Sequence, residues 1–289
     1  FEKLSDKFES IRQRETDLVK VGISPHAPYT VSSKLFELIA EASILTGFPM
    51  TIHASESKDE ENLMRTGEGF FAEIYRKQGL DWNSPRSTSI EYLNRLGVLS
   101  ARPLLAHCVT VSDSDIELIA GNRARIAHCP KSNAKFGHGV APFDKFVEGG
   151  IKVGLGSDSV ASNNSCDLLE ESRFAALFAR ALHRSGSFQT AGDIIRSATL
   201  GGAEALGLEN TIGSLEIGKQ ADIIAVSTKN IAQKPLYDIY SSLLFASNAR
   251  DVIFTMVGGR ELYRENEYLS VDEQEIRTKA EELSAKLRD

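Results

Sequence analysis

Four short apolar runs in this chain each end at a side chain suited to catalysis. The runs are VGISPHAPYT, PMTIHASES, RPLLAHCVT and IKVGLGSDS, and they present His26, His53 with Glu56, His107 and Asp158. In a parallel α/β barrel the carboxyl ends of the strands surround one mouth, so we expect these side chains to converge although they are far apart in sequence. Three imidazoles and two carboxylates around one mouth can bind a divalent metal and activate water on it. The pattern therefore favours a metal-dependent hydrolase.

Apolar strands alternate with amphipathic helices through the first half of the chain. The segment 35–46 has apolar residues at helical spacing and stops at Gly47, a common residue at a helix end. Further strands are expected at 49–53, 103–107, 125–129 and 151–156, and further helices within 62–78 and at 90–96, 113–120 and 143–150. This alternation indicates a parallel sheet with crossover helices. The apolar strands are typical of a sheet covered on both faces.

The pattern changes after Asp158. Helices are expected at 168–183 and 191–206, an alternating strand at the end of the turn-rich segment 211–227, and a β-hairpin at 251–269. The pair Gly258–Gly259 is suited to the turn of that hairpin. The charged amphipathic tail 271–289 is expected to form a helix that packs on the surface. The predicted units are a barrel portion at 1–206, a small β portion at 207–268 and a C-terminal helix at 269–289.

Composition argues against several classes of partner. The net charge is −7 and no cluster of Lys and Arg stands out, which argues against a nucleic-acid or anionic membrane surface. No apolar stretch approaches the roughly 20 residues of a membrane helix. Cys108, Cys129 and Cys166 are too scattered for a disulfide framework or a C-x-x-C metal site. A small-molecule substrate is the expected partner, the cytoplasm is the expected compartment, and a homo-oligomer is left open.

Six motifs occur in a fixed order between residues 21 and 268. They are SPHAPYT, IHASES, LLAHCV, HCPKSNAKFGHGVAPF, GLGSDSVASNN and GSLEIGKQADIIAV. Together they resemble the amidohydrolase superfamily, and within it the branch of methylthioadenosine/S-adenosylhomocysteine deaminases, aminodeoxyfutalosine deaminases and triazine chlorohydrolases. The resemblance implies an α/β fold, a distorted (β/α)8 TIM barrel with a β-sandwich made from both chain termini.

The resemblance also implies roles for the strand-end residues. It makes His53 and Asp158 metal ligands, Glu56 the proton shuttle, and His107 a catalytic group that polarises the attacked carbon's substituent or steadies the metal-bound water. Asp158 can also accept the proton of the attacking water. Each residue has a plainer alternative: a core histidine for His53, a solvated loop acid for Glu56, and a helix cap for Asp158. Since strand neighbours face opposite sides, Cys108 is expected on the helix side if His107 faces the mouth.

Other candidate residues have more open roles. His26 resembles the family's substrate-binding histidine, and Asn133 is a second candidate substrate contact. His128 fits a structural hydrogen bonder and a substrate contact equally well, and His138 is given no role. The loop aromatics Phe70, Phe71 and Trp82 could stack on a planar heterocycle, but cover over the barrel rim is the favoured interpretation.

The expected activity is the hydrolytic deamination of an amino-substituted purine or nucleoside, of the aminodeoxyfutalosine or adenosine type. The expected cofactor is one divalent metal, Zn or Fe, which lowers the pKa of a bound water toward about 7. One alternative is a chlorohydrolase or another amidohydrolase with the same metal centre. Another is a catalytically silent relative used for binding or assembly, which would have no need to keep Glu56, His107 and Asp158 together.

The expected metal site and barrel are incomplete in this sequence. The family's first barrel strand ends in an H-x-H pair of ligands, and no H-x-H occurs among the six histidines here. The first recognisable strand already carries the fourth-strand motif SPHAPYT, which implies strands four to eight and the C-terminal part of the sandwich. We expect the first three strands upstream of Phe1, with the H-x-H pair roughly 100 or more residues earlier.

Overall fold

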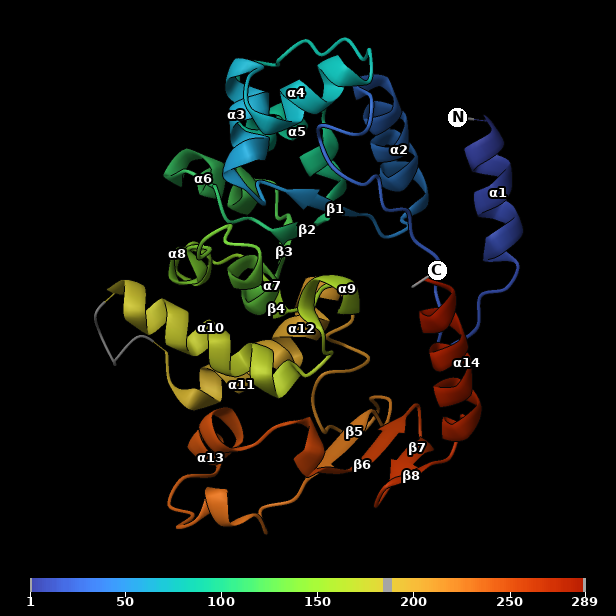
Figure 1. Ribbon diagram of the computed structural model, residues 1–289, viewed down its shortest axis with the longest axis vertical. Helices are drawn as coiled ribbons and strands as arrows, with labels where there is room; N and C mark the ends of the chain where they lie inside the picture. Colours follow the sequence, from blue (N-terminus) through green and yellow to red (C-terminus); the bar gives the residue numbers. More distant parts are fainter. Residues whose placement is uncertain (1, 184–188, 288–289) are drawn as a thin grey trace.

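The computed structural model describes residues 2–183 and 189–287 (Figure 1). Its first unit is a parallel sheet with strand order β1-β2-β3-β4. The strands are β1 (Thr51–Ala54), β2 (Leu104–His107), β3 (Arg125–His128) and β4 (Val153–Leu155). The segment before β1 runs parallel to it, because Ile23 bridges Met50 and the amide of His53 donates to the carbonyl of His26 at 2.9 Å. The carboxyl ends of these five segments therefore lie at one edge of the sheet.

Helices precede, connect and follow the parallel strands, and those predicted at 35–46, within 62–78 and at 90–96, 113–120, 143–150 and 168–183 are present. They are α1 (Glu2–Arg12), α2 (Ser33–Thr46), α3 (Lys58–Thr66), α4 (Phe70–Lys77), α5 (Ser89–Arg95), η1 (Val98–Ala101), α6 (Asp113–Gly121), α7 (Pro130–Lys135), α8 (Phe143–Glu148), α9 (Val160–Asn163), α10 (Leu168–His183), α11 (Ala191–Ala198) and α12 (Leu200–Leu206). Local signals fix their ends: Ser32 caps α2, Ser112 forms a capping box on α6, and Gly47 ends α2 in the left-handed region.

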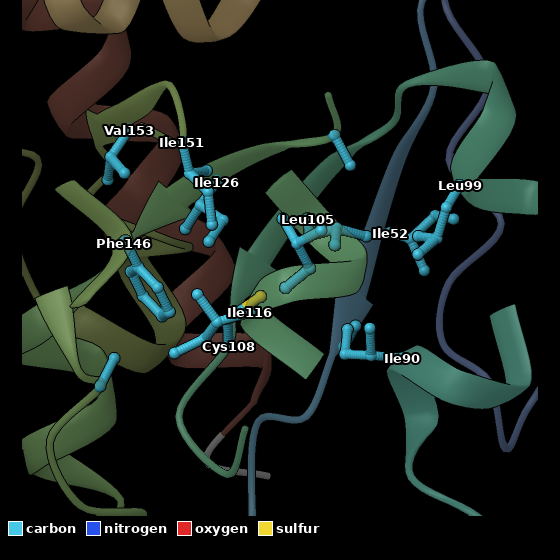
Figure 2. Close-up of a cluster of buried hydrophobic side chains, with 14 of the residues drawn as sticks. Ile52, Ile90, Leu99, Leu105, Cys108, Ile116, Ile126, Phe146, Ile151 and Val153 are labelled. Carbon is cyan, nitrogen blue, oxygen red and sulfur yellow. The ribbon is translucent and has the colours of Figure 1, made fainter. Parts of the chain in front are cut away.

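The core lies between one face of the parallel sheet and these helices (Figure 2). Ile52, Leu105, Ile126 and Val153 are in register across the four strands and form a continuous buried row. Side chains from helices and loops cover this row, among them Ile90, Leu99, Ile116 and Phe146. Residues on the opposite face of β1, β2 and β3 are only half-buried. Full cover on both faces was predicted, and among the described residues only the helix side has it.

The segment 191–206 forms two helices, α11 and α12, where the sequence predicts one. The break is at Thr199, whose φ of −121° and ψ of −97° are not helical. It lets α12 turn onto β4, where a Cβ atom on Gly154 would lie 2.8 Å from the Cα of Gly202. The two glycines therefore allow a backbone approach that side chains would prevent, which apolar periodicity does not reveal.

A second sheet follows α12 in the sequence. It is antiparallel with strand order β5-β6-β7-β8. The elements of this part of the chain are β5 (Ile223–Val226), η2 (Ile231–Gln233), α13 (Ile239–Ala246), η3 (Ala249–Asp251), β6 (Val252–Val257), β7 (Arg260–Arg264), β8 (Glu267–Tyr268) and α14 (Glu273–Lys286). The predicted hairpin is confirmed, and both turn glycines, Gly258 and Gly259, have positive φ angles.

The C-terminal helix α14 lies at the edge of the molecule (Figure 1). The sequence predicts the helix correctly but predicts that it packs on the surface. No residue of α14 is buried, and the side chains of Ile276 and Leu283 are more than half exposed. The predicted packing is therefore wrong for the described part of the chain.

No helix within residues 2–183 and 189–287 is both long enough and apolar enough to cross a membrane.

Candidate active site

Three of the strand-end side chains meet at the carboxyl edge of the parallel sheet. His53 in β1, His107 in β2 and Asp158 after β4 each bring one potential ligand atom to the same point, and these atoms lie within 4.8 Å of one another. The rings of His53 and His107 are stacked with their centroids 5.5 Å apart. The convergence predicted from the four apolar runs is thus present for these residues, and no other group of this kind occurs in the part of the chain that the structure describes.

The backbone leaves the strand conformation where it delivers His107 and Asp158. His107 has a φ of 74°, Cys108 of 50° and Asp158 of 60°, all in the left-handed region that residues other than glycine rarely adopt. Leu105 and Cys108 both point into the core on the helix side (Figure 2), so simple alternation would have placed His107 there too. The break in alternation turns His107 toward His53. Such strain persists where the surrounding structure enforces it, which is common at active sites.

Hydrogen bonds orient both imidazoles toward the shared point. Nδ1 of His53 lies 3.0 Å from the carbonyl oxygen of His26, and Nδ1 of His107 lies 2.9 Å from Oδ1 of Asn133. Both oxygens can only accept, so each Nδ1 donates its hydrogen and each neutral ring keeps a lone pair on Nε2. Metal-binding histidines are held by outer hydrogen bonds of this kind.

The carboxylate of Asp158 is held by three donors. The hydroxyls of Ser132 and Ser162 donate to Oδ2 at 2.6 and 2.7 Å, and the amide of Ser159 donates to Oδ1 at 2.6 Å. Partial burial alone would raise the pKa of Asp158, but these hydrogen bonds outweigh it, with help from His107, and the pKa is lowered. The group is thus kept as the anion that a metal requires.

A buried polar network fixes the loops that carry Ser132 and Asp158. The buried carboxylate of Glu171 accepts from the amide of Lys131 at 3.1 Å and from the side chain of Asn163. Asn163 also donates to the carbonyl of Ser157, next to Asp158. The network therefore ties the start of α7 to the loop after β4, and a single sequence without structure gives no sign of it.

Glu56 lies beside this cluster, with two imidazoles near the same carboxylate oxygen. Its Oε1 is 3.7 Å from Nε2 of His107 and 3.6 Å from Nε2 of His138. Glu56 is in the short loop between β1 and α3, where the H-x-x-E spacing from His53 predicted it. The contact with His138 was not predicted.

Glu60 fixes the backbone of the Glu56 loop. Its carboxylate accepts from the amides of Ser55 and Glu56, each at 2.8 Å, and from the hydroxyl of Ser89. Glu60 is 1% exposed, and burial raises its pKa although these hydrogen bonds act in the opposite direction. The burial of Glu60 within the polar run SESKDEEN was not predicted from the sequence. The S-x-x-E spacing from Ser57, which caps α3, was the available signal.

Replacing Glu60 with Ala should lower the free energy of unfolding by about 3 kcal/mol, because the amides of Ser55 and Glu56 would lose their only acceptor in a buried position. Urea unfolding of the complete protein measures this. Glu61→Ala is the matched control, since Glu61 makes only surface ion pairs with Lys58 and Arg65, worth less than about 1 kcal/mol. Equal losses in the two variants would show that the Glu60 network does not stabilise the loop.

His26 lies next to His53, with the two ring centroids 5.0 Å apart. Its Nδ1 is 2.8 Å from the hydroxyl of Thr30, and its ring is exposed at the edge of the cluster. Burial and the neighbouring His53 lower its pKa, partly offset by Glu56. His26 is therefore adjacent to the cluster and accessible to solvent.

Asn133 and His128 are placed differently from His26. Asn133 is 1% exposed and its Oδ1 is engaged by His107; its Nδ2 has no hydrogen-bond partner among the described residues but is shielded from solvent. His128 is equally buried and stacks on Phe143 with centroids 5.2 Å apart. Burial, and then His107, lower the pKa of His128 to about 3, so it stays neutral. Both side chains are therefore shielded from solvent in the part of the chain that the structure describes.

The loop aromatics form a ring cluster beside His26. Phe71 stacks on Tyr29 with centroids 4.9 Å apart, and Tyr29 lies edge-on to His26 at 6.4 Å. Trp82 points into the protein, where its indole donates to the carbonyl of Leu63 at 3.2 Å. This contact fits Trp82 as cover over the rim of the site, which is the interpretation favoured from the sequence. Phe71 instead stacks on Tyr29, and Tyr29 contacts the ring of His26.

The donor set fits a divalent metal. Imidazole nitrogens and a carboxylate are ligands that zinc and iron accept. All three are pre-oriented by partners that are themselves fixed, and a carboxylate suited to proton transfer lies beside them. The arrangement is suited to hydrolysis with acid–base assistance.

Several known proteins are similar to this chain in sequence. The amidohydrolase family matches residues 1–262. The chain is 35% identical over 277 residues to a 5-methylthioadenosine/S-adenosylhomocysteine deaminase of Pyrococcus abyssi, covering 96% of this chain and 61% of that protein. It is also 35% identical over 272 residues to a 5'-deoxyadenosine deaminase of Methanosarcina acetivorans, covering 93% of this chain and 59% of that protein. The chain thus spans about three fifths of the length of these relatives.

Solved structures of related proteins have a similar fold. An adenosine deaminase from Xanthomonas campestris with bound zinc superposes with a TM-score of 0.87 at 27% identity, covering 99% of this chain and 62% of that one. An atrazine chlorohydrolase from Arthrobacter aurescens superposes with a TM-score of 0.82 at 23% identity, covering 98% and 60%, which supports the fold alone. Since the family match extends over most of the chain, this chain belongs to the amidohydrolase family.

Proposed function

We propose that the complete protein carrying this chain is a metal-dependent deaminase of an adenosine-like nucleoside. The observation that carries the proposal is the cluster of His53, His107 and Asp158 with Glu56 directly beside it. The deaminase relatives support the leaving group and the nucleoside class. Within that class an aminodeoxyfutalosine or adenosine-type substrate is proposed first.

His53 and Asp158 would hold the metal, Zn or Fe, which when bound would supply Lewis-acid activation of water. Asp158 would accept the proton of the attacking water and, together with His107, orient its oxygen. Glu56 would donate a proton to a ring nitrogen of the substrate as the oxygen adds to the amine-bearing carbon. The carboxylate of Glu56 would then take the proton of the added hydroxyl and pass it to the amine, so that the carbon–nitrogen bond breaks, ammonia leaves and the oxygen stays on the carbon as a carbonyl. The proton held by Asp158 would return to Glu56 before the next turnover.

The neighbours of the cluster receive supporting roles. His26 is proposed as a substrate contact, because its ring is open beside His53. For Asn133 we propose the orientation of His107 in place of the direct substrate contact expected from the sequence, since its oxygen is already engaged. His128 is proposed as a neutral packing residue.

We further propose that residues outside this chain complete the barrel and the metal site. The parallel sheet with the segment before β1 would be strands four to eight of an eight-strand barrel, which the parallel strand order and the Ile23–Met50 bridge support. A typical catalytic zinc site has three protein ligands, and His53 and Asp158 provide only two. An upstream H-x-H pair would supply the ligands that are missing. The antiparallel sheet would be the C-terminal part of a composite sandwich.

A leaving-group assay on the complete protein tests the proposal. We expect one ammonia per molecule of 5'-deoxyadenosine or 5-methylthioadenosine consumed, and no chloride from a chlorinated triazine. Chloride release without ammonia would favour the chlorohydrolase alternative, because the same metal centre could act on either leaving group. No release from any substrate, with metal bound, would favour a catalytically silent relative.

A further inference from the structure

His138 lies in a short loop between α7 and α8 that brings it over the candidate site. The loop has the sequence Gly137-His138-Gly139, and the two glycines have φ angles of 71° and 110°. Glycine adopts such angles at little cost and few other residues do. The two glycines therefore allow the turn that directs His138 toward Glu56. Its Nε2 lies 3.6 Å from Oε1 of Glu56.

Two further contacts hold His138 in this position. Its amide donates to the carbonyl of Asn133 at 2.9 Å, and Asn133 is the residue that orients His107. The ring of Phe136 stacks on the imidazole with centroids 5.5 Å apart and an interplanar angle of 20°. The side chain of His138 is 25% exposed, so it is largely enclosed without being part of the core.

The two imidazoles near Glu56 differ in what they can donate. Nδ1 of His107 carries its hydrogen toward Asn133, so the neutral ring presents only a lone pair at Nε2. The ring of His138 makes no hydrogen bond elsewhere among residues 2–183 and 189–287, so its hydrogen can lie on Nε2. His138 is therefore the imidazole that can donate to the carboxylate of Glu56 while remaining neutral.

We propose that His138 is a positioning residue for Glu56. Its Nε2 faces Oε1 of the carboxylate at 3.6 Å, just beyond hydrogen-bond distance, and would donate to that oxygen after a small approach, which would leave Oε2 to exchange protons with the substrate. The proposal rests on the proposed function, because it assigns His138 to the proton shuttle of that reaction. A substrate contact at the rim is the competing role, and it would act on binding instead of on the proton transfer.

The test uses the complete, metal-loaded protein with the His138→Ala and His138→Gln variants. We expect His138→Ala to lower kcat about tenfold, the scale of one lost hydrogen bond, with KM changed by less than about threefold. Gln can place an amide N–H near the position of the imidazole Nε2, so His138→Gln should recover most of the rate. Metal content and the Kd of the deaminated product, measured by calorimetry, should not change. Lys135→Ala is the control in the same region, since that exposed side chain donates to Asn164 and to no other residue within 2–183 and 189–287.

A double-mutant cycle separates the possible outcomes. If His138 acts through Glu56, adding His138→Ala to Glu56→Gln should cause no further loss of kcat. An equal tenfold loss in both backgrounds would overturn the proposal, as would a rise in KM and product Kd with kcat unchanged, or no effect at all. If Glu56→Gln alone were fully active, the proposed function would fail independently of His138.

Discussion

Replacing Glu56 with Gln in the complete protein is expected to lower kcat by about 10²-fold or more while metal content stays near normal. The amide keeps the shape of the side chain but cannot move a proton between water, the ring nitrogen and the leaving amine. Glu56 is not among the three residues whose ligand atoms converge, so the metal site should be retained. Steady-state kinetics together with metal analysis of the same sample provides the measurement.

Asp59→Asn is the matched control for Glu56→Gln. It removes the same charge three residues away, on an exposed side chain in the first turn of α3. Its kcat should stay within about twofold of the wild type, as is usual for a surface substitution. Full activity in Glu56→Gln would remove Glu56 from the mechanism, and an equal loss in both variants would point to the net charge of the loop instead.

Substitution of the residues proposed as ligands should remove the metal. His53→Ala and Asp158→Ala are each expected to lower bound metal by tenfold or more, which is within the range that metal-site substitutions produce. His107→Ala should lose activity with metal retained, because we propose that His107 orients the attacking water and does not hold the metal. Its contacts with Asn133 and Glu56 place it beside the proton shuttle. Elemental analysis of the three purified variants measures the metal directly.

Asp113→Ala controls for the loss of a carboxylate, because Asp113 is an exposed residue that pairs with Lys145 and is not among the residues whose ligand atoms converge. Its metal content should equal that of the wild type. The ligand-capable atom of His107 lies in the same cluster as those of His53 and Asp158. Equal metal loss in all three site variants would therefore make His107 a third ligand and overturn its assignment.

Elements whose signals are local could be predicted from the sequence. The hairpin at Gly258–Gly259 and the capped helices α2 and α6 follow from turn and cap residues within a few positions. The strand ends were predictable because an apolar run followed by a polar side chain marks the point where a buried strand reaches the surface. The break between α11 and α12 depends on contact with β4, which periodicity along one helix does not contain.

In the candidate site, too, some features follow from the sequence and others depend on the folded structure. The meeting of His53, His107 and Asp158 follows from their places at the ends of parallel strands. The contribution of Glu60 does not, because an acid in a charged run is ordinarily solvated and only the folded loop buries it. His138 was given no role for a similar reason: it lies in a glycine-rich loop far from Glu56 in sequence.

The most direct test of the account is ammonia release by the complete protein after metal removal and restoration. The metal is removed with a chelator, Zn²⁺ or Fe²⁺ is returned, and ammonia formed from 5'-deoxyadenosine is counted against nucleoside consumed. We expect the metal-free protein to release no ammonia, and one equivalent of metal to restore a yield of one ammonia per nucleoside. Undiminished ammonia release from protein shown to be free of metal would contradict the account.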